Sequence, residues 1–170
     1  MIVKTSQVTG RRQLCFESFG DLLLEAESLA QGDVVMLGNW TLGQVFLHLS
    51  LSMHASIDGL RADVTWWQRL VVRLLYGRRL LSGPMPAGLR LSPETASVLL
   101  PPPIGVDEGL ATLREAVERL SFETERARHP LLGDMSLDQW DSFHLRHAEL
   151  HLSFARPLHV PVPGNVPVLV

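Results

Sequence analysis

The chain has 170 residues, 46% of them hydrophobic, and a formal net charge of −3 at pH 7. This length suits one sizeable core, so we expect a single domain over residues 1–170, with its core at about 11–156 and a proline-rich tail at 157–170. Lys and Arg form no long run, and this charge pattern predicts no nucleic-acid partner.

The cysteine count and the hydropathy of the sequence exclude further classes of protein. The single cysteine, Cys15, cannot form an intramolecular disulfide or a thiolate metal cluster within one chain. Because it lies between Leu14 and Phe16, we expect a small buried hydrophobe rather than a nucleophile. The N-terminus has no apolar run before its basic pair, and no stretch of about 20 uncharged apolar residues occurs. These features predict a cytoplasmic protein without a membrane span.

The first half of the chain predicts two helices. After an extended arm at residues 1–12, apolar residues at helical spacing predict a helix over about 17–30 that ends near Gly32. Residues 32–39 are predicted to form a loop with a short extended piece. Thr41 is a suitable N-cap for a second helix, which ends near Gly59 and carries His48 on its apolar side.

The middle of the chain combines a basic amphipathic segment with a long connection. A third helix is predicted over about 66–81, with four arginines. Such a helix can lie on a membrane surface. The favoured interpretation is a helix packed on the protein, with snorkelling arginines or with one face in a dimer contact. Residues 82–105 contain six prolines, which predicts a long irregular excursion that could cover a site mouth. Asp107 is then expected to cap a further helix that ends before His129.

The last predicted helix, residues 136–155, carries the densest group of histidines. Ser136 and Gln139 form a capping-box pattern at its start. Spacings of four, three and four residues then place four side chains on one stripe of the helix. The stripe contains Trp140, His144, His147 and His151.

These elements predict an all-α fold. Four long helices can form an antiparallel bundle, and the four prolines of the tail at 157–170 exclude a further helix there. The tail is expected to pack as an extended strap or to contact a partner chain, and a homodimer is a further expectation.

The histidine pattern predicts a metal site. The side chains of His147 and His151 lie one helical turn apart and can bind one ion, but two ligands are only half of a site. His48, central on another long helix of the bundle, is the candidate third ligand. Three imidazoles leave a coordination position open for water or substrate, which is typical of catalytic zinc. The alternative is that each histidine is an ordinary core residue.

The remaining polar residues divide into neighbours of this site and others. We expect His144, Trp140 and Ser52 to line the pocket or to support the ligands, with direct ligation by His144 as the alternative. His54 and His129 are expected to be structural or solvated, and the tail residue His159 carries no spacing argument. Asp141 and Glu149 face away from the stripe, so the sequence provides no general base. Phosphate-binding loops, GxSxG and CxxC motifs are absent from the sequence.

Several motifs resemble the DinB/YfiT-like superfamily over about residues 11–154. They are WTLGQVFLHLS around His48, HPLLGDMS from His129 with the QW that follows, and RHAELHLSF around His147 and His151. The resemblance implies a four-helix bundle with up-down-down-up connections, the long crossover at 82–105, and zinc or nickel at His48, His147 and His151. The arginine and glutamine that often follow the histidine pair in other branches are replaced here by Leu152 and Ser153.

The resemblance also implies a reaction. Some members activate a low-molecular-weight thiol such as bacillithiol or mycothiol at the metal, so we expect thiol-dependent transfer to an electrophilic small molecule. One alternative is metal-dependent hydrolysis with bound water as the nucleophile. Another is a non-catalytic bundle that binds a ligand or a partner.

Overall fold

The structure is a computed structural model that describes residues 2–60, 65–67, 70–72, 74, 81, 83–88 and 93–158. Its elements, in chain order, are η1 (Thr5–Gln7), α1 (Phe19–Gln31), β1 (Val34–Met36), α2 (Leu42–Asp58), α4 (Pro93–Leu99), α5 (Val106–Phe122), α6 (Leu137–Leu152) and β2 (Ala155–Pro157). The predicted all-α bundle is confirmed, with one very small sheet beside it.

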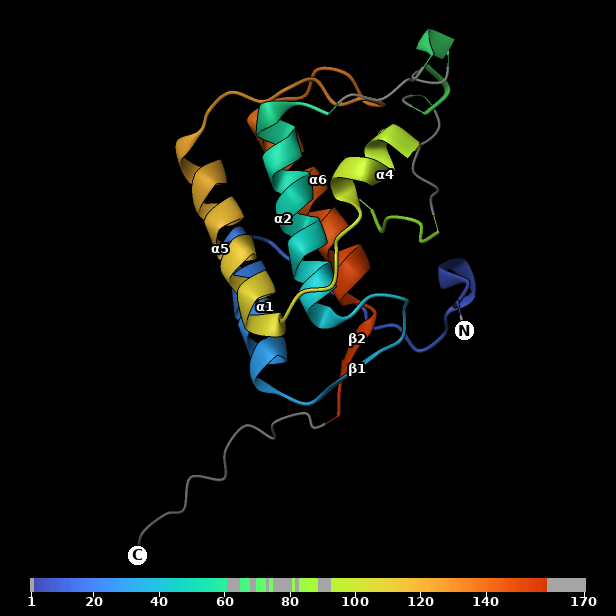
Figure 1. The fold of residues 1–170 in the computed structure, drawn as a ribbon. Coiled ribbons are helices and arrows are strands. Elements are labelled where there is room, and N and C mark those ends of the chain that lie inside the picture. The colour runs from blue at the N-terminus through green and yellow to red at the C-terminus, as the bar shows by residue number, and fades with distance from the viewer. Residues whose placement is uncertain are drawn as a thin grey trace, which may run out of the picture.

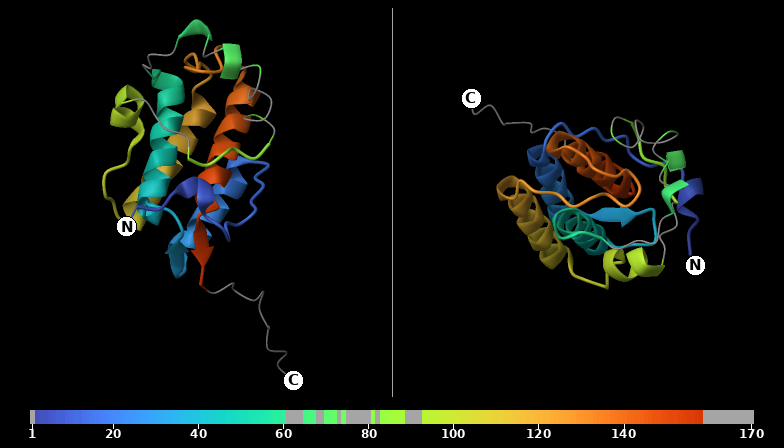
Figure 2. Two further views of the ribbon diagram at one scale, coloured as in Figure 1. Left: turned by 90° about the vertical axis from the view of Figure 1, so that its right-hand side faces the viewer. Right: turned by 90° about the horizontal axis from the view of Figure 1, so that it is seen from above.

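The four long helices α1, α2, α5 and α6 pack side by side around one core (Figures 1 and 2). In Figure 1, α1 and α6 run downward, whereas α2 and α5 both run upward. Two parallel neighbours need a long connection, and the crossover between the end of α2 and the start of α5 supplies it. The core contains fully buried side chains from all four helices, including Leu22, Phe46, Leu113 and Leu152.

Capping residues set the starts of three helices. Ser18, Thr41 and Ser136 each form a complete capping box with the residue three positions later. Each box satisfies backbone N–H groups that the first helical turn leaves free. The starts of α2 and α6 therefore agree with the sequence prediction.

Helices α2 and α5 approach each other most closely at two glycines. A Cβ atom on Gly109 would lie 2.5 Å from the carbonyl oxygen of Gly43, and one on Gly43 would lie 2.6 Å from the carbonyl oxygen of Gly105. Both clashes would be with backbone rather than with a mobile side chain. Glycine at these two positions is what allows the two helices to pack at this distance.

A two-stranded sheet closes the lower end of the bundle. β1 and β2 are antiparallel, with Val34 opposite Pro157 and Met36 opposite Ala155. The predicted extended piece after the first helix therefore pairs with residues 155–157, and the last helix ends at Leu152 rather than at the predicted residue 155. Residues 159–170, including His159, lie outside the described residues.

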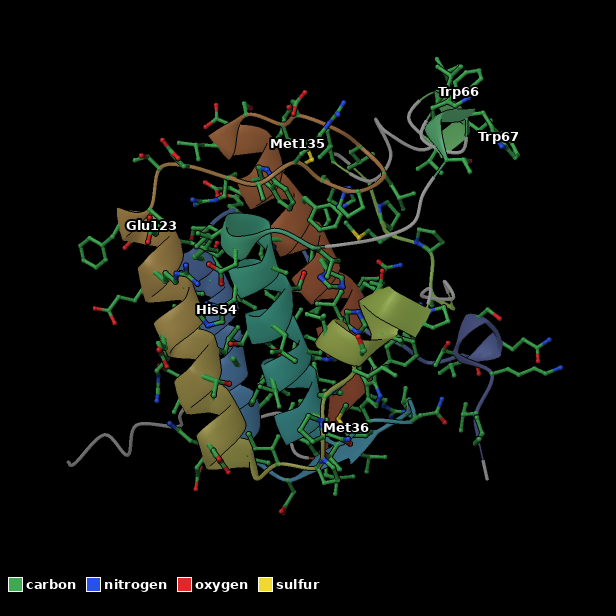
Figure 3. The ribbon with its side chains drawn as sticks, turned by 45° about the horizontal axis from the view of Figure 1, so that its top comes forward. Met36, His54, Trp66, Trp67, Glu123 and Met135 are labelled. Carbon is green, nitrogen blue, oxygen red and sulfur yellow. The ribbon has the colours of Figure 1, made fainter. Side chains whose placement is uncertain are left out.

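Two predictions about the connections were incomplete or wrong, and a third lies largely outside the described residues. The segment 82–105 is not wholly irregular, because Pro93–Leu99 forms the short helix α4 beside α2. Gly105, not Asp107, is the N-cap of α5, and Asp107 lies in its first turn, where its charge favours the positive end of the helix dipole. Much of the predicted helix at 66–81 lies outside the described residues, although Trp66 and Trp67 are helical and project away from the bundle (Figure 3).

The prediction that Cys15 is buried was also wrong, because its side chain is exposed. Residues 11–16 have no helical or strand assignment, and burial alternates at their end: Leu14 and Phe16 face inward and Cys15 faces out. Successive side chains of an extended backbone point to opposite sides, so apolar neighbours do not predict burial of the residue between them.

Candidate metal centre

Three imidazoles meet in the space between α2 and α6. His48 lies in the middle of α2, and His147 and His151 lie one turn apart near the end of α6. The Nε2 atom of His147 is 3.3 Å from Nε2 of His48 and 3.0 Å from Nε2 of His151. One ring nitrogen from each residue lies within 4.8 Å of the other two, so this group could hold a metal ion.

These separations are compatible with a single shared ion. Nitrogens bonded to one ion at about 2.0–2.1 Å lie about 2.9 Å apart when the bond angle is about 90°, and about 3.4 Å apart at a tetrahedral angle. Both observed Nε2 separations fall within this interval. Two of the three pairs of ring nitrogens are thus already spaced as ligands of one ion.

The orientation of His48 is set by the crossover. Its Nδ1 atom lies 2.7 Å from the carbonyl oxygen of Leu99, at the end of α4. A carbonyl only accepts hydrogen bonds, so Nδ1 carries the hydrogen and donates it. The Nε2 atom of His48 therefore has a lone pair, which faces the other two histidines. An outer hydrogen bond of this kind is the usual means of fixing the tautomer of a metal-binding histidine.

Hydrogen bonds alone cannot satisfy the three Nε2 atoms. The Nε2 atom of His147 has either one hydrogen or one lone pair, yet it contacts two other ring nitrogens. If it has a lone pair, it faces the lone pair of His48; if it has a hydrogen, that hydrogen cannot make two linear bonds. A cation that accepts a lone pair from each ring removes this conflict. The Oγ atom of Ser52, 3.4 Å from Nδ1 of His147, can then accept the remaining hydrogen of that ring.

The environment keeps all three imidazoles neutral. Burial lowers the pKa of His48, although its bond to Leu99 opposes this effect. Burial lowers the pKa of His147 and of His151 well below the ordinary value, and the neighbouring histidines lower both further. The neutral form is the one that donates a lone pair to a metal.

Two aromatic rings lie against the three histidines. The ring of Trp40 stacks on His151 with centroids 5.4 Å apart and lies 4.7 Å from the ring of His48. The ring of Phe143 lies 5.8 Å from that of His147. Trp40 was not among the predicted site residues, because it precedes the N-cap of α2 and no helical periodicity includes it.

His144 and Trp140 form a separate buried pair one turn earlier in α6. Ser56 donates its hydroxyl hydrogen to the carbonyl of Met53 at 2.6 Å, so His144 donates from Nε2 to Ser56 Oγ at 3.1 Å. The rings of Trp140 and His144 stack, and burial lowers the pKa of His144 to about 3. His144 thus bonds to Ser56 rather than to the three-histidine group, and its predicted supporting role stays a prediction.

The other described histidines have structural partners. His129 is half-buried and accepts hydrogen bonds at Nδ1 from the N–H groups of Leu131 and Leu132. His54 lies between α2 and α5, where its Nδ1 contacts Arg119 (Figure 3). Neither belongs to the three-histidine group.

The acids of α6 lie away from the group, as predicted. Glu149 accepts from the N–H of Phe16 at 2.6 Å and pairs with Arg146, so it fixes the segment that precedes α1. Asp141 is not among the residues that could hold a metal. Within the described part of the chain, the candidate metal group is made of histidines alone.

Comparison with known proteins identifies a family but no activity. A family model described as "Protein of unknown function (DUF1569)" matches residues 8–158. Neither the curated proteins nor the solved structures contain a significant match. Across the described residues, no helix is both long and apolar enough to cross a membrane.

Proposed function

The chain belongs to the DUF1569 family of proteins of unknown function. We propose that it binds one divalent metal ion through His48, His147 and His151. The observation that carries the proposal is the double contact of the His147 Nε2 atom with two other ring nitrogens. The resemblance of the same three positions to the DinB/YfiT-like superfamily supports it independently.

Zinc or nickel suits this donor set. Both ions accept imidazole nitrogens readily, whereas calcium and magnesium prefer oxygen ligands. Three protein ligands leave at least one position for an exogenous molecule. When bound, such an ion lowers the pKa of a coordinated thiol or water and so supplies a nucleophile near neutral pH.

We infer that the nucleophile is the sulfur of a low-molecular-weight thiol. In this reaction the thiol loses its S–H proton to the solvent, its sulfur forms a bond to a carbon atom of an electrophilic small molecule, and the leaving group departs with the bonding electron pair. The chain has to orient the imidazoles and to restrict water. The carbonyl of Leu99 and the hydroxyl of Ser52 orient the imidazoles of His48 and His147. The rings of Trp40 and Phe143 restrict the access of water.

Hydrolysis by bound water is the alternative reaction, and the composition of the site favours it less. A hydrolytic metal site commonly uses a carboxylate that takes the proton from the attacking water. The three-histidine group includes no Asp or Glu of the described chain. Thiol transfer needs no such base once the thiolate has formed.

The test is consumption of a thiol in the presence of an electrophile. Bacillithiol, mycothiol and glutathione would each be incubated with 1-chloro-2,4-dinitrobenzene and with zinc- or nickel-loaded protein. We expect at least one thiol to be consumed faster than without protein, and His147→Ala to abolish the difference. Turnover of esters or amides without added thiol would favour hydrolysis. No consumption of any thiol with any electrophile would contradict the transfer reaction.

A further inference from the structure

Arg11 occupies an unusual position for a charged residue. It lies in the segment before α1, next to the end of α6, and is only partly exposed. Its Nε atom donates to Ser153 Oγ at 2.9 Å, and its guanidinium carbon lies 4.4 Å from the centre of the Phe154 ring. One edge of the guanidinium and one of its faces are therefore held in place by protein.

The rest of the Arg11 guanidinium has no hydrogen-bond or ion-pair partner among the residues that the structure describes. Within the described chain, Arg11 forms no ion pair, and its two terminal nitrogens make no hydrogen bond. The acids that contact this segment are engaged elsewhere: Glu25 pairs with Arg12, and Glu149 pairs with Arg146. A cation that is partly removed from water without a counter-ion is costly, so the position favours binding of an anion.

This cation lies against the end of α6, at the residues that follow His151. The partners of Arg11, Ser153 and Phe154, follow His151 closely in sequence, and the N–H of Phe154 donates to the carbonyl of His151 at 3.3 Å. The ring of Trp40 stacks on the imidazole of His151.

We propose that Arg11 binds a carboxylate group of the molecule that occupies the open position at His48, His147 and His151. This inference rests on the proposed metal site and specifies the class of its ligand. The guanidinium fork matches the two oxygens of a carboxylate, and its bond to Ser153 fixes the direction in which the free edge points. The site thus selects small anionic molecules over neutral ones of the same shape.

For thiol transfer, the inference distinguishes between cosubstrates. A thiol that carries a carboxylate is held at two points. Its sulfur is held at the ion that the three histidines would bind, and its carboxylate is held at Arg11. A neutral thiol is held only at the sulfur. Two-point attachment also fixes the direction from which the electrophile must approach.

The inference can be tested by ligand binding to cobalt-loaded protein, which reports on the site without turnover. Mercaptoacetate, 3-mercaptopropionate and 4-mercaptobutyrate would each be compared with the corresponding amide at pH 7. The Co(II) absorption spectrum gives the Kd of each, and the series of chain lengths makes no assumption about the distance to Arg11. The proteins are wild type, Arg11→Gln, Arg11→Lys and Arg114→Gln. Arg114→Gln is the matched control, because Arg114 pairs with Glu27 at the exposed surface of α5 and α1.

We expect wild type and Arg114→Gln to bind at least one acid about tenfold more tightly than its amide. Arg11→Gln should bind both about equally, and Arg11→Lys, which keeps the charge but not the fork, should retain part of the preference. Thermal unfolding of each variant shows whether it is folded.

Two outcomes would contradict different claims. If wild type binds cobalt but shows no preference for the acids, or if Arg11→Gln keeps the full preference, the role of Arg11 is wrong and the metal site stands. If wild type binds no cobalt, the metal site is wrong, and the inference about Arg11 fails with it.

Discussion

The Nδ1 atom of His48 lies 2.7 Å from the carbonyl oxygen of Leu99, which is 51 residues later in the chain. This single bond connects the centre of α2 to the crossover between α2 and α5. The crossover therefore does more than join two parallel helices, because it fixes which ring nitrogen of His48 faces the other histidines.

Weakening the hydrogen bond between His48 and the carbonyl of Leu99 should lower the affinity for a metal ion. Leu99 is buried with an exposed fraction of 8%, whereas its neighbour Leu100 is 53% exposed. Leu99→Ala removes the packing that positions the carbonyl, and we expect the affinity for zinc to fall about tenfold or more. Leu100→Ala should have little effect. Competition with a chelator of known affinity measures both, and equal affinities for the two variants would contradict a role for Leu99 in the site.

Two serines on α2 give a second matched pair. Ser52 Oγ lies 3.4 Å from Nδ1 of His147, whereas Ser50 Oγ donates to the carbonyl of Thr112 in α5 at 3.0 Å. We expect Ser52→Ala to lower metal affinity by up to about tenfold with little change in the stability of the metal-free protein. Ser50→Ala should lower stability by about 1 kcal/mol and leave metal affinity unchanged. The opposite pattern would show that Ser52 does not support His147.

His129 should make the metal-free protein sensitive to acid. Burial lowers its pKa to about 4 in the folded state, against about 6.5 in the unfolded chain. Between these values the unfolded state binds a proton that the folded state does not, so stability falls as the pH decreases from about 6.5 to about 4. His129→Asn keeps an acceptor for the N–H groups of Leu131 and Leu132 but cannot titrate.

The comparison requires urea unfolding of both proteins at pH 8 and pH 4.5, with a chelator present. On acidification the wild type should lose about 2 kcal/mol more than His129→Asn. Burial is the main cause of the lowered pKa of His144 and His147 and is the same in both proteins, so most of their contribution cancels. Equal losses would show that His129 is protonated to the same extent in the folded and unfolded states.

The glycine contact between α2 and α5 predicts a large effect from one methyl group. Gly109→Ala places a Cβ atom 2.5 Å from the carbonyl oxygen of Gly43, so the helices must move apart. We expect a loss of about 1–3 kcal/mol in the free energy of unfolding, despite the better helix propensity of alanine. Gly105→Ala is the control, since its Cβ would have no atom within 4 Å. It should cost less than about 1 kcal/mol, and similar losses in both variants would contradict the close approach.

Sequence reasoning could predict those parts of the fold that depend on local signals. The N-cap at Thr41, the capping box at Ser136 and the apolar periodicity of α1 and α2 predicted the helices, and four-residue spacing brought His147 and His151 together. The third histidine required a long-range argument, which rested on two central helix positions facing each other in a bundle.

The other features of the fold and of the candidate site depend on contacts between residues that are distant in sequence. The carbonyl of Leu99 has no side-chain signature, so nothing in the sequence connects it with His48. Trp40 and Arg11 lie in irregular segments where periodicity gives no direction, yet Trp40 stacks on His151 and Arg11 contacts Ser153 and Phe154, which follow it. Helix α4 follows a proline-rich stretch, and its proline occupies the first helical position, where the missing N–H costs nothing.

The most direct measurement is the metal content of protein purified without a histidine tag. Wild type would be compared by elemental analysis with His48→Ala, His147→Ala and His151→Ala, and with His144→Ala as the control. We predict about one equivalent of zinc or nickel in wild type and in His144→Ala, and strong loss in the other three variants. Wild-type protein that takes up no metal even when zinc and nickel are supplied in excess would contradict the proposed metal centre.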